Sequence, residues 1–106
     1  MIAIAAALAA AELPQPPFEA LTQFLYWNQC VVYGATAMAG GDRSPDEILE
    51  IQFRDCRERE ERVQAEFDAH QPGHTPEQMA RFRATIREQA LRRIAERRQP
   101  SPPASK

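Results

Sequence analysis

The residues best suited to chemistry in this chain are two cysteines, Cys30 and Cys56, and two histidines, His70 and His74. Two cysteines with two histidines form a ligand set typical of zinc modules, but the short spacing of a zinc-binding cysteine pair is absent. Cys56 and His70 also lie 14 residues apart on one predicted helix, a rise of about 21 Å, whereas ligands must lie within about 2.3 Å of the metal. We therefore predict no metal site and no cofactor. A weaker surface site made by the two histidines alone stays open, and solvated histidines are the simpler interpretation.

Catalytic patterns are also missing. The sequence contains no G-x-S-x-G, no phosphate-cradling glycine loop and no H-E-x-x-H. The histidines fall in a turn with no evident nucleophile beside them, and the carboxylates lie among arginines on predicted exposed faces. We predict no catalytic residue and no enzymatic activity.

The positions of the two cysteines in the predicted helices suggest what they do. Cys30 falls in a predicted helix over residues 18–39, and Cys56 falls in the helix that follows the turn at residues 40–43. In an antiparallel hairpin folded about that turn, both cysteines reach the same height, about 15–20 Å from the turn. The spacing therefore predicts an inter-helix disulfide, Cys30–Cys56, which persists only in an oxidising compartment. The alternative is a pair of buried thiols in a reducing cytosol.

Periodicity and punctuation predict an all-α fold, a three-helix domain over residues 18–98 built as an antiparallel hairpin plus a third helix. The first helix should be central because it is apolar around much of its circumference. One of its sides carries Phe18, Leu21, Leu25, Val32 and Ala39, and Phe24, Val31, Ala35 and Met38 widen that side. Gly40–Gly41 should end the helix in the left-handed conformation.

Capping patterns mark the other two helices. Ser44-Pro45-Asp46-Glu47 predicts a capping box, and Thr75-Pro76-Glu77-Gln78 repeats it. Apolar residues then recur on one face of each helix, interrupted once by Glu60. They are Leu49, Phe53, Cys56, Val63 and Phe67 in the second helix, and Met79, Phe82, Ile86, Ala90 and Ile94 in the third.

The ends of the chain differ from this domain. Residues 1–11 contain a ten-residue apolar run closed by small residues, which predicts a signal peptide and a periplasmic or secreted protein, although Lys and Arg are missing from its start. Residues 12–17 read as a Pro-rich linker and residues 99–106 as a disordered Pro/Ser tail.

Composition restricts the partners. The 106 residues carry a net charge of −2, and no apolar run reaches the roughly 18 residues needed to cross a bilayer. Residues 75–106 hold eight basic residues against three acidic ones, so a nucleic-acid-binding third helix is an alternative. We do not expect nucleic acid as a partner, because a basic helix docked beside an acidic one explains the same pattern.

The aromatic residues of the first helix suggest a protein partner. Tyr26, Trp27 and Tyr33 lie partly off the helix's apolar side, so they could anchor another protein or a second copy of the chain. Ordinary core filling is the alternative.

Residues 74–79, His-Thr-Pro-Glu-Gln-Met, resemble the L-T-P-E-Q run of small helical periplasmic chaperones and metal-stress proteins of the LTxxQ type. The resemblance implies an exported helical chaperone and assigns no site residue here. We expect an exported, non-enzymatic interaction or structural module. The alternatives are a periplasmic chaperone or stress-binding protein and a cytosolic nucleic-acid-binding protein.

Overall fold

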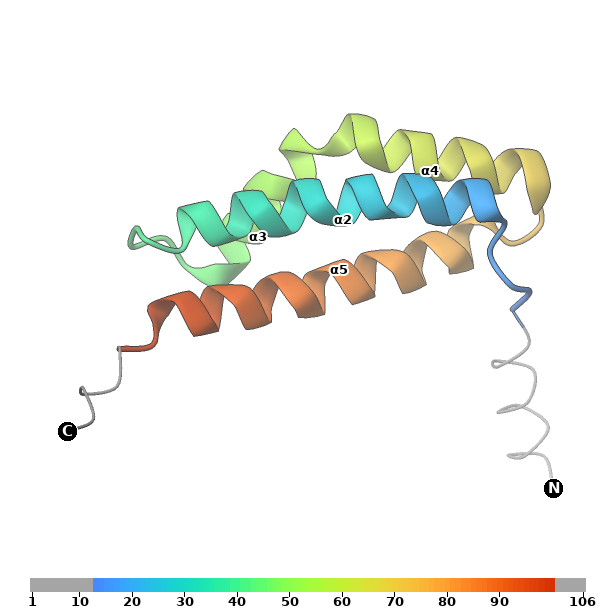
Figure 1. The fold of residues 1–106 in the computed structure, drawn as a ribbon. Coiled ribbons are helices and arrows are strands. Elements are labelled where there is room, and N and C mark those ends of the chain that lie inside the picture. The colour runs from blue at the N-terminus through green and yellow to red at the C-terminus, as the bar shows by residue number, and fades with distance from the viewer. Residues whose placement is uncertain (1–12, 101–106) are drawn as a thin grey trace, which may run out of the picture.

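Four helices make up the part of the chain that the computed structural model describes, residues 13–100 (Figure 1). They are α2 (Phe18–Met38), α3 (Pro45–Asp55), α4 (Arg57–His70) and α5 (Thr75–Arg98). No strand occurs in this range, so the all-α prediction is confirmed. The predicted signal peptide and residues 101–106 of the predicted tail lie outside the described residues.

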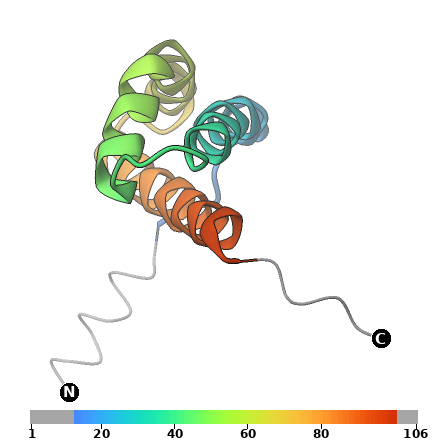
Figure 2. The ribbon, with the colours of Figure 1, turned by 90° about the vertical axis from the view of Figure 1, so that its left-hand side faces the viewer.

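Helix α2 packs against each of the other three helices, as expected for the most apolar element. Helix α4 runs antiparallel to α2, whereas α5 runs in the same direction as α2 (Figure 1). Seen end-on, α2, the α3–α4 pair and α5 occupy the corners of a triangle (Figure 2). In the described range, no helix covers the outer side of α2.

The predicted disulfide is confirmed. Cys30 of α2 and Cys56 are bonded, and their Cα atoms lie 6.1 Å apart. Cys56 is 2% exposed and belongs to the core, so the bond joins the two arms of the hairpin from within. The turn between α2 and α3 therefore folds the chain back as the cysteine spacing predicted.

The second predicted helix is broken into α3 and α4. The break lies at Cys56, whose φ of −98° and ψ of 18° leave the helical region. Neither proline nor glycine occurs near this point, so the local sequence carries no signal for the break. The change of direction lets α3 cover α5 and one end of α2, while α4 follows the rest of α2 (Figure 1). Each segment buries its own apolar pair, Ile48 and Leu49 on α3 and Val63 and Phe67 on α4.

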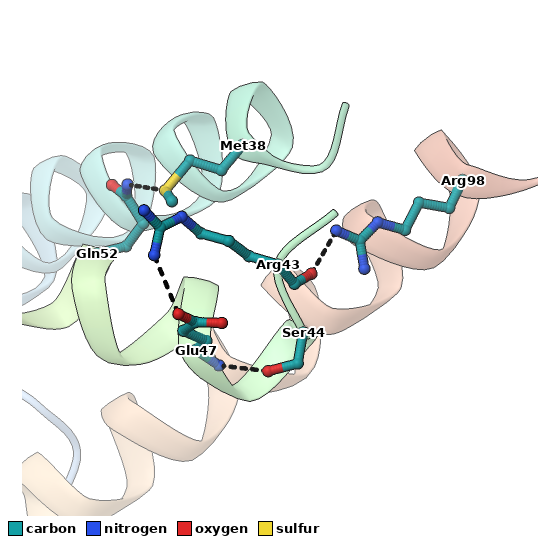
Figure 3. A network of polar contacts seen from close by, with 6 residues as sticks. All are labelled: Met38, Arg43, Ser44, Glu47, Gln52 and Arg98. Carbon is teal, nitrogen blue, oxygen red and sulfur yellow. Dashed lines mark hydrogen bonds and ion pairs between the residues drawn. The ribbon is translucent and has the colours of Figure 1, made fainter. Parts of the chain in front are cut away.

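The N-terminal cap of α3 forms as predicted, but only in part. The Ser44 hydroxyl accepts a hydrogen bond from the Glu47 backbone N–H at 3.2 Å (Figure 3). The Glu47 carboxylate does not return to Ser44 and pairs with Arg43 at 3.0 Å. Only one of the two hydrogen bonds of a capping box therefore forms, and the Glu47 carboxylate makes an ion pair with Arg43 instead of the second one.

The C-terminus of α2 ends differently from the prediction. No glycine in the described residues has a positive φ, so the expected left-handed glycine cap is wrong. Arg98, near the end of α5, supplies the missing donors instead. Its guanidinium donates to the carbonyls of Ala39 at 3.0 Å, Gly41 at 3.2 Å and Arg43 at 2.6 Å (Figure 3 shows the last). A side chain of α5 thus satisfies the carbonyl of Ala39, the residue that caps α2, and two carbonyls of the turn that follows.

The second predicted cap, at Thr75, is wrong. His74 precedes α5 as the N-cap residue and makes no side-chain cap bond, while Thr75 is the first helical residue. The Thr75 hydroxyl is buried without a hydrogen-bond partner, and Gln78 is fully buried. Thr75 does not cap the helix because the Gln78 backbone N–H donates to the His74 carbonyl at 3.0 Å. The Gln78 side-chain amide donates to the Pro14 carbonyl in the chain before α2.

Candidate interaction face of α2

The inner side of α2 faces α4 and α5 with Ala20, Trp27, Val31 and Ala35, all fully buried. The Trp27 ring meets Phe53 edge-on, with the ring centroids 6.2 Å apart. The Arg83 guanidinium lies 5.7 Å from the Trp27 centroid and 4.8 Å from that of Phe53. Of the two interpretations of Trp27, the structure supports the core, because a partner cannot reach this side chain.

The outer side of α2 carries the large apolar residues that remain exposed in the described chain. We call this set the α2 face: Phe18 (78% exposed), Leu21 (41%), Leu25 (63%), Tyr26 (49%) and Tyr33 (70%). Glu19 is the one charged residue in the whole helix. Two of the three predicted partner residues, Tyr26 and Tyr33, therefore lie on an uncharged, solvent-facing surface.

Small residues explain why α2 turns this side outward. Ala20, Ala35 and Ala39 face the other helices, which lets the backbones approach closely. Gly34 goes further, because a Cβ atom at this position would overlap the side-chain amide of Gln52 on α3. Gln52 uses the space to donate to the Met38 sulfur at 3.1 Å (Figure 3). The side that begins with Phe18, Leu21 and Leu25 has no such small residues at these three positions and is left in solvent.

One ion pair that was not predicted from the sequence joins two of the helices that cover the buried side of α2. Arg83 of α5 forms an ion pair with Glu60 of α4, whose side chain is only 20% exposed. Glu60 is the residue that interrupts the apolar stripe of the second predicted helix. A carboxylate within an apolar stripe was the sequence signal that a cation lies beside it, but this signal did not identify Arg83 as the partner.

The chain before α2 is held against the end of the bundle. The Gln78 amide donates to the Pro14 carbonyl at 2.8 Å and to the Gln71 side chain at 3.1 Å. Gln71 donates in turn to the Gln15 carbonyl at 2.5 Å. Residues 13–17, predicted as a linker, are therefore tied to the turn between α4 and α5 at the end of the bundle where α2 begins.

The described residues give little structural support to the other sites that were considered, a metal site and a membrane-spanning helix. In residues 13–100, no three His, Cys, Asp or Glu side chains gather as a metal site, and both thiols are used in the disulfide. His70 lies 3.6 Å from a Glu66 oxygen, and His74 lies 3.7 Å from Glu77, each forming a local contact on the surface. None of the described helices combines the length and apolar character of a bilayer span.

The basic helix α5 uses part of its charge to contact the other helices. Arg87 pairs with Asp46 of α3 at 2.8 Å, and Arg92 pairs with Glu88 within α5 at 3.2 Å, as its sequence spacing predicted. Arg83 and Arg98 are engaged as described above. Two of the seven arginines of α5, Arg83 and Arg87, therefore form ion pairs with the acidic α3–α4 pair, while all seven are exposed.

No protein-family model, curated protein or solved structure matches this chain. Fold and site together define a small all-α domain that is braced by a disulfide and leaves one aromatic helix face uncovered.

Proposed function

We propose that this chain is an exported, non-enzymatic interaction module that binds another protein through the α2 face. The observation that carries the proposal is the exposure of five large apolar side chains along a helix with a single charge. Contiguous exposed apolar surface marks partner sites in soluble domains, and tyrosine is a favoured anchor in such sites.

Two features support export. The Cys30–Cys56 bond is of a kind that persists in oxidising compartments and is rare in the cytosol. The apolar run before Glu12 has the length and the closing small residues of a signal peptide. Intact mass of the protein recovered from its native host tests this part. We expect loss of Met1–Ala11 and of two thiol hydrogens. Recovery of the full chain with two free thiols would refute export.

The binding surface is tested by site-specific photo-crosslinking in the native host. A benzophenone side chain at Tyr33 should give a discrete crosslinked product. The same group at Ala84, exposed on α5 and outside the α2 face, serves as the matched control. A product that contains two copies of this chain identifies a homodimer, which the proposal includes. No product from Tyr33, or equal products from both positions, would refute the proposed surface.

A chaperone is the second candidate, and one observation favours it. Phe18, Leu21 and Leu25 are exposed apolar residues of the kind that bind unfolded clients without sequence preference. Suppression of the heat aggregation of several unrelated enzymes would favour the chaperone over a module with one partner. The nucleic-acid alternative has the weakest support, because Arg83, Arg87 and Arg98 are already engaged within the domain.

A further inference from the structure

Two hollows flank the C-terminal half of the α2 face. One, of about 410 Å³, lies between α2 and α5, and its walls include Val32 and Thr36. The other, of about 360 Å³, lies between α2 and α4 over Cys30. Both are lined by Gln29 and Tyr33. Tyr33 therefore forms an aromatic ridge between two depressions.

A third hollow, of about 410 Å³, continues the first one toward the N-terminus of α2. It is lined by Thr22, Leu25, Tyr26, Asn28 and Gln29. Because it shares Asn28 and Gln29 with the hollow beside α5, the two hollows adjoin, and their α2 residues together extend from Thr22 to Thr36. At 1.5 Å per residue this stretch is about 21 Å long, or about four helical turns.

Every charged residue that lines these three hollows is an arginine. Arg59 lies on the α4 side, with its guanidinium 5.5 Å from the centroid of the Tyr26 ring. Arg92 and Arg93 form the α5 side. Glu88 neutralises Arg92, while Arg59 and Arg93 form no ion pair within the described residues. The acidic Glu19 lies near the other end of α2, where His70 faces it at 3.9 Å. The surface is thus an apolar ridge between two cationic walls.

We infer that this surface binds an acidic amphipathic helix, about four turns long, from a partner protein. The inference rests on the proposed function and specifies its partner. Apolar residues spaced by three and four would pack along the α2 face, and carboxylates on both flanks would meet Arg59 and Arg93. Arginine holds carboxylates through paired, charge-assisted hydrogen bonds, which fixes orientation as well as affinity.

Residues 1–12 and 101–106 are poor candidates for this helix. Residues 1–12 contain one carboxylate side chain, that of Glu12, and residues 101–106 contain none. Nucleic acid fits less well, because three arginines, one of them already paired, are few against the six to ten phosphate contacts of a typical DNA-binding surface. A bilayer surface is flat, whereas the hollows on both sides of Tyr33 have room for side chains from a curved partner.

A displayed library of helical peptides, each about 15 residues long, tests the inference with the full, disulfide-bonded chain as bait. We expect selected peptides to carry Asp and Glu on both flanks of an apolar stripe. Their affinity should fall about tenfold or more in Arg59→Glu/Arg93→Glu, because like charges would then face each other. Arg57→Glu is the matched control, since Arg57 is exposed two residues before Arg59 and points about 200° away around α4. Its affinity should stay within about twofold.

The outcomes separate the inference from the proposed function. If selected peptides show no acidic excess, or bind Arg59→Glu/Arg93→Glu as well as the unchanged chain, the acidic helix is refuted. If Tyr33→Ser still weakens those peptides, the α2 face remains a binding surface and the proposed function survives. If binding ignores both sets of changes, both ideas fail. Tighter, Arg59-dependent binding of a labelled oligonucleotide or of phosphatidylglycerol vesicles would also overturn the inference.

Discussion

Reduction of the Cys30–Cys56 bond should lower the free energy of unfolding substantially without changing the fold. The bond joins residues 26 apart, and for a loop of that size the chain-entropy relation gives about 3.5 kcal/mol. A domain of this size has a total stability of about 5–15 kcal/mol, so the bond supplies a large share. For a domain of 60–100 residues, the same loss corresponds to a fall in the melting temperature of roughly 15–25 °C.

Urea unfolding followed by circular dichroism, with and without reductant, measures this loss directly. The protein should keep its helical signal after reduction at low urea, because the core around Trp27 does not depend on the bond. The double variant Cys30→Ala/Cys56→Ala is the control and should not respond to reductant. A difference below about 1 kcal/mol between oxidised and reduced protein would show that the bond does not restrict the unfolded chain as argued.

Three further predictions concern single side chains. In urea unfolding, Trp27→Ala should lower the free energy of unfolding by about 3–5 kcal/mol because it leaves a cavity in the core, whereas Tyr33→Ser on the exposed face should lower it by no more than about 0.5 kcal/mol. Equal losses would contradict the assigned burial. Gln78→Ala should cost about 1–3 kcal/mol and speed proteolysis of the segment before α2, and an unchanged cleavage rate would show that Gln78 does not hold that segment. Arg98→Gln should cost about 1–2 kcal/mol by leaving carbonyls at the end of α2 unpaired, while its neighbour Arg97→Gln should be near neutral; similar values for the two would remove the capping role.

Local signals were reliable at some helix ends and failed at others, such as Gly40–Gly41, where no left-handed cap forms. The start of α3 follows from Ser44 and Pro45, because a cap and a fixed φ act on the next few residues alone. The cysteine pairing was also predictable, since a hairpin about a short turn brings residues at equal distances from it to the same height. The cap at Thr75 failed because the helix begins at Thr75 itself, and the Gln78 backbone N–H donates to the His74 carbonyl and not to the Thr75 hydroxyl.

The candidate site was predictable only in part. Tyr26, Trp27 and Tyr33 were predicted to contact a partner, and Tyr26 and Tyr33 lie on the exposed surface, whereas Trp27 does not. Arg59 and Arg93, which flank the surface, were not singled out as part of it, because they belong to other helices and only packing brings them beside α2.

By itself, the sequence determined the helical content, the positions of the turns and the partnership of the two cysteines. It could not determine which side of α2 is buried. That helix is apolar around much of its circumference, so its hydrophobic pattern has no single direction, and Phe18, Leu21 and Leu25 look as suited to a core as Trp27 and Val31 do. Only the tertiary structure decided this, because the close approach of α3, α4 and α5 selects the side with Ala20, Gly34 and Ala35 and leaves Phe18, Leu21 and Leu25 in solvent.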